Sequence, residues 1–156
     1  MHKTQLRSVD LDSAVFTKDL TYHRESWLLD CEVRELSHHV IGLRRMLLTK
    51  LEWFLNERGI DRCGTVEIRG FLAYVRNGHE SPSGRWNNPK RDKPVRPRTI
   101  RDYHAHLRAF FRWLVREGSI SESPVDRIEA PIARPDQVKP FTPDQVAALL
   151  SAAKGG

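Results

Sequence analysis

The tract from residue 96 to residue 118, RPRTIRDYHAHLRAFFRWLVREG, constrains the fold most, because its apolar and basic residues separate onto two sides of one helix. The apolar residues recur at steps of three and four, the spacing of a single helical face. They are Ile100, Tyr103, Leu107, Phe110 and Leu114. Pro97 suits a helix start and Gly118 a helix end. The pattern predicts a long helix that buries its apolar face in a core.

The other side of this predicted helix carries cations. They are Arg98, Arg101, His104, Arg108 and Arg112. Arginine presents a planar fork that grips phosphate or guanine with two hydrogen bonds, and a basic N-terminal half suits a helix that enters a DNA groove. A solvated helix face with no partner is the alternative interpretation.

Three further helices are expected upstream. Residues 21–36 place Trp27, Leu28, Cys31 and Leu36 on one face. Ser37 stands as an N-cap before a second helix, and Gly59 follows that helix as its stop. The apolar face of the second helix is formed by Val40, Leu43, Leu47, Leu51 and Phe54. His38, Arg45 and Thr49 lie opposite.

A third helix is expected to start at Thr65, which can cap it, with Glu67 in the first turn. Its apolar face consists of Ile68, Leu72 and Val75, and Asn77 and Gly78 close it. After the long fourth helix, Ser123 and Pro124 predict a short helix through Arg127.

Helical periodicity stops between residues 78 and 97, where four prolines and paired asparagines predict an irregular loop. Residues 85–101 hold seven basic residues and one acidic residue, and so match the net charge of +6 of the whole chain. We name residues 80–97 the arm. A basic arm on a neutral body attracts a phosphate backbone, although a charged loop without a partner has the same composition. For Trp86 we favour an anchor on the body over contact with a ligand.

Composition excludes several classes of protein. The 156 residues are 39% hydrophobic and 29% charged, with no apolar run that could span a membrane and no signal peptide, so we expect a cytoplasmic protein. Cys31 and Cys63 lack CxxC spacing, and we interpret both as reduced thiols. With His38, His39, His104 and His106 they form no zinc motif, so we expect no metal site. No cofactor motif is present and no small-molecule substrate is indicated.

The tract RPRTIRDYHAHLRAFFRWLVREGSISESPVDRIEAP, followed by KPFTPDQVAALLSAA, resembles the N-terminal half of tyrosine recombinases of the phage-integrase type. The features that carry the resemblance are a Pro-Arg-Thr start, an aromatic FFRWL helix, a Ser-Pro step and an FTP-acid tract. The helices LSHHVIGLRRMLLTKLEWFLNERGI and TVEIRGFLAYV also occur in the order of the family.

This resemblance implies an all-α fold, a SAM-like orthogonal bundle of four to five helices that forms one jaw of a clamp on double-stranded DNA. It implies a core-binding domain at residues 21–130, after a tail at 1–20. A linker at 131–140 and the first helix of a catalytic domain at 141–156 would follow. The second and fourth helices would face DNA, and other recombinase subunits would be partners of the whole protein.

In this family a tyrosine of the catalytic domain attacks a phosphodiester, while two arginines, a lysine and His or Trp residues of the same domain stabilise the pentavalent transition state. Tyr22, Tyr74 and Tyr103 do not match the nucleophile's motif, so we predict that this chain is not itself an enzyme. The arm is longer than in many relatives, and its contacts are not carried over from the family.

We therefore predict DNA contacts on the second helix, the arm and the fourth helix. On the second helix they are His38, His39, Arg45 and Thr49. On the arm and the fourth helix they are Lys90, Arg91, Lys93, Arg96, Arg98, Thr99, Arg101, His104 and Arg108. A helical protein-interaction module and a stand-alone DNA-binding regulator are the alternative functions.

Overall fold

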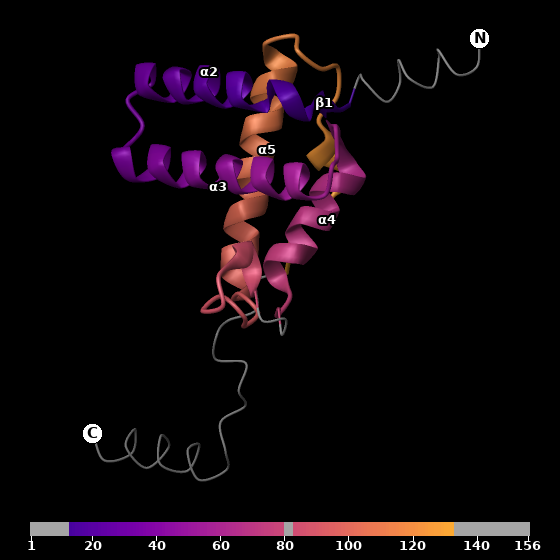
Figure 1. The fold of residues 1–156 in the computed structure, drawn as a ribbon. Helices are drawn as coiled ribbons and strands as arrows, with labels where there is room; N and C mark the ends of the chain where they lie inside the picture. Colours follow the sequence, from indigo (N-terminus) through magenta and orange to yellow (C-terminus); the bar gives the residue numbers. More distant parts are fainter. Residues whose placement is uncertain (1–12, 80–82, 133–156) are drawn as a thin grey trace, which may run out of the picture.

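The computed structural model describes residues 13–79 and 83–132, and these form a bundle of four α-helices. The helices are α2 (Leu20–Val33), α3 (His38–Glu57), α4 (Thr65–Arg76) and α5 (Pro97–Arg116). Figure 1 shows α2 and α3 side by side, with α5 crossing both steeply and α4 lying beside α5. The prediction of an all-α bundle is confirmed.

The core lies where α5 crosses the other helices. Its largest fully buried side chains include Trp27, Phe71, Phe110 and Phe111. The rings of Trp27 and Phe110 lie 5.1 Å apart and join α2 to α5. Aromatic pairs at this separation add to the free energy of apolar burial. The apolar face of α5 predicted from the sequence therefore lies in the core.

The helix α3 begins as predicted, since Ser37 Oγ accepts a hydrogen bond from the backbone N–H of Val40 at 3.2 Å. The predicted core positions Leu47, Leu51 and Phe54 are buried. Val40 and Leu43 are only half-buried. Their places in the core are taken by Ile41, Leu48 and Leu55, because the neighbouring helices cover α3 on a wider and shifted arc.

The start of α4 differs from the prediction. Its N-cap is Gly64, whose backbone N–H donates to Glu67 Oε1 at 2.9 Å, so Thr65 is not the cap. The Thr65 hydroxyl instead donates to the carbonyl of Pro124 at 2.8 Å and ties α4 to the short helix η3 (Pro124–Arg127). Ser123 caps η3 as predicted, accepting from the N–H of Val125 at 3.2 Å.

Residues 13–20, which we expected in the tail, pack on the bundle. The strand β1 (Val15–Phe16) pairs antiparallel with β2 (Arg62–Cys63), with Val15 opposite Cys63. The 3-10 helix η1 (Thr17–Asp19) continues β1 into α2, and the Thr17 hydroxyl donates to the carbonyl of Ile60 at 2.7 Å. The rest of the expected tail and nearly all of the expected linker and C-terminal helix lie outside the described residues.

Both cysteines are buried free thiols, and burial raises the pKa of Cys63. No helix of the described residues is long and apolar enough to cross a membrane. Within the same residues, no group of three or more His, Cys, Asp or Glu side chains is arranged to hold a metal ion.

Candidate nucleic-acid interface

The arm folds back on the bundle through Trp86. Its ring centroid lies 5.6 Å from that of Trp53 and 5.1 Å from that of Tyr74, and its backbone N–H donates to the Tyr74 hydroxyl at 2.9 Å. The predicted anchor is therefore confirmed. The turn before it requires glycine, because a Cβ on Gly84 (φ +68°) would lie 2.0 Å from the carbonyl oxygen of Asn88.

Arg85, counted among the basic residues of the arm, is a structural residue and does not belong to the exposed patch. It is 3% exposed, and its Nη2 donates to the carbonyls of Asn77 at 2.6 Å and Lys93 at 2.7 Å. These bonds join the end of α4 to the far side of the arm. Burial lowers the pKa of Arg85. Its guanidinium holds the arm in a closed loop.

Backbone hydrogen bonds close the same loop at its base. The N–H of His79 donates to the carbonyl of Asp92 at 2.6 Å, and the N–H of Val95 donates to the carbonyl of Arg76 at 3.2 Å. The arm therefore presents its cations from a folded support. Its exposed cations are Lys90, Arg91, Lys93 and Arg96.

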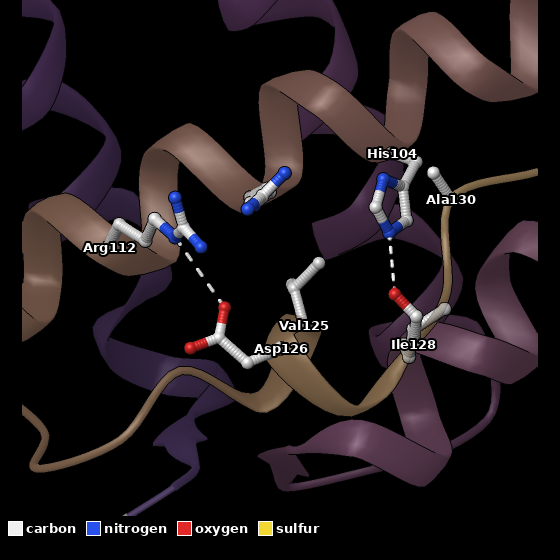
Figure 2. A pocket seen from close by; sticks show the side chains of 7 residues that line it. His104, Arg112, Val125, Asp126, Ile128 and Ala130 are labelled. Carbon is white, nitrogen blue, oxygen red and sulfur yellow. Dashed lines mark hydrogen bonds and ion pairs between the residues drawn. The ribbon is translucent and has the colours of Figure 1, made fainter.

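The exposed side of α5 continues this basic surface. Arg98, Arg101 and Arg108 are exposed as predicted, and Thr99 is half-buried. Arg101, Arg108 and Arg112 line a groove beside α5 whose opposite wall includes Ala130. An adjoining pocket, seen in Figure 2, extends the groove to Asp126 and Ile128.

Six exposed cations of this surface form no ion pair with a carboxylate of residues 13–79 and 83–132. They are Lys90, Arg91, Lys93, Arg98, Arg101 and Arg108. We call this set the arm–α5 cations. At the far end of the groove Arg112 differs, since its Nε lies 3.5 Å from Asp126 Oδ1 (Figure 2). These six cations place unpaired positive charge on the arm and on the exposed side of α5 as far as Arg108.

His104 does not lie on the exposed side of α5 as predicted. It is 4% exposed, and its Nε2 donates to the carbonyl of Ile128 at 2.8 Å (Figure 2). In helical projection His104 lies at the edge of the apolar arc, and the segment after η3 covers that edge. His104 therefore fastens this segment to α5, and its predicted position on the exposed side of the helix is wrong.

The predicted residues of α3 are exposed, but their charge is largely compensated. Arg45 forms an ion pair with Glu25 of α2, and Arg24 of α2 pairs with both Glu25 and Glu52. The Thr49 hydroxyl donates to the carbonyl of Arg45 at 2.8 Å. His38 and His39 are exposed at the start of α3. Arg45 of α3 therefore differs from the arm–α5 cations, because it forms an ion pair with a carboxylate.

Two cations that the sequence did not indicate lie between these regions. Lys50 Nζ lies 3.4 Å from the Tyr103 hydroxyl and 5.1 Å from the ring centroid of Trp86. Arg44 lies over the ring of Trp27 at 4.5 Å and donates from Nε to Nδ1 of His106 at 3.4 Å. Both residues stand next to the apolar positions of α3, where a charged side chain is unexpected. This irregularity in the spacing is the signal in the sequence that could have pointed to them.

These features define the class of structure as an all-α bundle on which residues 83–97 of the basic arm pack. No family model matches the sequence, and no curated protein gives a significant match. Among solved structures, the integrase from mycobacterium phage Brujita is similar in fold, with a TM-score of 0.50 and 21% sequence identity. The match covers 72% of this chain and 33% of that integrase. The chain thus shares the helical arrangement of a part of an integrase, and it spans about a third of the length of that protein.

Proposed function

We propose that this chain is the core-binding domain of a tyrosine-type site-specific recombinase and binds duplex DNA at a recombination site. The observation that carries the proposal is the exposed set of arm–α5 cations, which no described carboxylate neutralises. Binding of such a surface to DNA releases the counterions condensed on the phosphates, which supplies a large favourable free energy. The shared fold with part of a phage integrase agrees with this role.

Different residues of the surface serve different purposes. Lys90, Arg91 and Lys93 project from a loop and are suited to phosphates, which set the position of the protein without reading sequence. Arg98 and Arg101, in the first turns of α5, are suited to base edges in a groove, together with Thr99 between them. Arg108 extends the phosphate contacts along the helix.

We propose that strand cleavage belongs to another domain of the parent protein. Tyr74 and Tyr103 are half-buried among other aromatic rings, and burial raises the pKa of the Tyr103 hydroxyl. Tyr22 is 72% exposed, but it lies on α2, away from the arm–α5 cations. Incubation of the chain with supercoiled plasmid is expected to trap no covalent protein–DNA adduct, and a tyrosyl adduct would contradict this assignment.

Titration of the chain with a duplex oligonucleotide at increasing salt tests the binding function. Arg101→Ala is expected to weaken binding by about 1–3 kcal/mol if it reads a guanine, and to relax sequence preference at that position. Lys93→Ala should lower the salt slope by about one for every sequence. Equal, salt-independent effects of the two variants would contradict the division into base and phosphate contacts.

A protein-interaction function is supported by a separate feature on α2. Tyr22, Leu29 and Val33 are 72%, 62% and 76% exposed and fall on one helical stripe. Exposed apolar stripes of this kind are typical of protein contacts. The stripe is suited to a second recombinase subunit, and it is also the surface that an adaptor would use. Binding of duplex DNA that lacks salt dependence would favour the adaptor.

A further inference from the structure

Three cations, one from α3 and two from the arm, lie close together beside Tyr103 of α5. Lys50 Nζ donates to the Tyr103 hydroxyl at 3.4 Å. Arg85 and Arg91 come from the arm, where the Arg85 N–H donates to the carbonyl of Arg91 at 2.9 Å. The charges of both arginines act on the Lys50 ammonium group. Trp86 packs against the same lysine.

The positive charge of Lys50, Arg85 and Arg91 is not neutralised by ion pairs with carboxylates of the described residues. Burial lowers the pKa of Lys50, and the charges of Arg91 and Arg85 lower it further. Asp92 is the carboxylate that acts on Arg85, but it is exposed and forms no ion pair with these cations within the described part of the chain. Like charges at close range that are shielded from water destabilise one another.

Arg85 adds a second indication that a counter-charge is missing. Its Nη2 is satisfied by two carbonyl oxygens, whereas its buried Nε has no hydrogen-bond partner among the described residues. A guanidinium that is 3% exposed and lacks a carboxylate partner is costly to bury. An anion bound beside it would lower that cost.

We propose that the Lys50–Arg91–Tyr103 cluster is a binding site for a tetrahedral oxyanion, and that a backbone phosphate of duplex DNA occupies it. Lys50 and Arg91 supply the charge, and the Tyr103 hydroxyl supplies a directional donor. The buried Arg85 contributes through its charge, which acts on Lys50 and Tyr103. The assignment to a DNA phosphate rests on the proposed function, whereas the oxyanion site itself does not.

The test compares Lys50→Met, which keeps the aliphatic stem on Trp86, with Lys18→Met in the full chain. Lys18 is a matched control, because its Nζ also lies over an aromatic ring, 5.4 Å from the centroid of Phe16. Two quantities are measured for each protein: the slope of duplex affinity against salt, and the rise in Tm caused by sodium sulfate over sodium chloride at equal ionic strength. Tyr103→Phe, which removes a single hydroxyl, serves if Lys50→Met fails to fold.

We expect Lys50→Met to reduce the salt slope by about one and to show a smaller rise in Tm with sulfate, because only the general effect of sulfate remains, while Lys18→Met keeps the full slope and the full rise. If only the sulfate effect is reduced, the site takes a free anion, and the assignment to a DNA phosphate is overturned. If Lys50→Met and Lys18→Met behave alike in both measurements, the site itself is overturned. If the unchanged chain binds no DNA while the sulfate difference persists, the proposed function fails and the anion site stands.

Discussion

Two arginine-bearing surfaces of the bundle differ in how their charge is balanced. On the α2–α3 surface, Arg24 and Arg45 form ion pairs with Glu25 and Glu52. On the other surface, the arm–α5 cations form no ion pair with a described carboxylate. The same residue type therefore stabilises helix packing in one place and remains open to a ligand in the other. Ion pairing therefore separates the arm–α5 surface from the α2–α3 surface.

The largest effect is expected when the unpaired surface loses its charge. The triple variant Arg98→Gln/Arg101→Gln/Arg108→Gln should weaken duplex binding roughly 100-fold, since three contacts at about 1 kcal/mol each sum to about 3 kcal/mol. The salt slope should fall by about one, because Arg108 is the one of the three assigned to a phosphate. Fluorescence anisotropy with a labelled duplex measures both. A loss of less than about threefold would remove the distinction between the two surfaces.

The next effect falls on the paired surface and concerns stability. Arg24→Met should lower the free energy of unfolding by about 2 kcal/mol, because it leaves the half-buried Glu52 carboxylate without its partner. Urea unfolding measures this change, with the exposed Arg34→Met as the control. Duplex affinity should stay within about twofold. A large loss of duplex affinity in a folded Arg24→Met variant would show that the α2–α3 surface contacts DNA despite its ion pairs.

A smaller effect is expected when Arg45 is released from its ion pair, because its charge could then contact DNA. Glu25→Gln removes the ion-pair partner of Arg45 and one of the two partners of Arg24. The Glu25 side chain is 48% exposed, so the substitution should change the stability of the fold little. The duplex salt slope should become steeper by up to about one. Glu32→Gln, which changes an exposed carboxylate of the same helix that forms no ion pair with a described residue, is the control. Equal slopes for both variants would place Arg45 outside the reach of DNA.

The smallest effect expected is a dependence of the free energy of unfolding on pH. It comes from His106 of α5, which contacts Arg44 of α3. Burial lowers the pKa of His106, the Arg44 charge lowers it further, and Asp102 opposes them. The unfolded chain then binds the proton more readily, so stability is lost as pH falls through the ordinary histidine value of about 6.5 toward the lower folded pKa. His106→Gln should flatten this loss between pH 7.5 and pH 5 in urea unfolding.

His23 acts in the same direction, since burial lowers its pKa against the influence of Asp19. The His106 variant should therefore keep part of the pH dependence, and a His23→Gln/His106→Gln double variant should keep less. A wild-type protein that gains stability on acidification would contradict the neutral state of His106, whose Nδ1 accepts from Arg44.

Local sequence signals predicted several helix boundaries and the exposed side of α5. The Ser37 and Ser123 caps, the Pro97 start of α5 and the exposure of Arg98 and Arg101 follow from steric and hydrogen-bonding rules that act within a few residues. Helical spacing also placed the apolar side of α5 in the core. Such rules need no knowledge of which helix lies next to which.

The features that the sequence did not predict involve partners that are distant in sequence. Arg45 meets a carboxylate twenty residues away, and His104 meets a carbonyl twenty-four residues away. Arg85 is buried because the arm folds over it. Helical spacing gives the direction of a side chain around its axis, but only tertiary packing decides whether a charge is neutralised, covered or left exposed. The division between the two surfaces was therefore beyond the sequence.

The most direct test of this division is the salt dependence of duplex binding by the unchanged chain, plotted as the logarithm of affinity against the logarithm of salt concentration. If the arm–α5 cations contact phosphates, the slope should lie between about −3.6, when four of them do so, and about −5.4, when all six do, since each phosphate contributes about −0.9. A slope near zero, or no binding at low salt, would contradict the assignment of this surface to DNA.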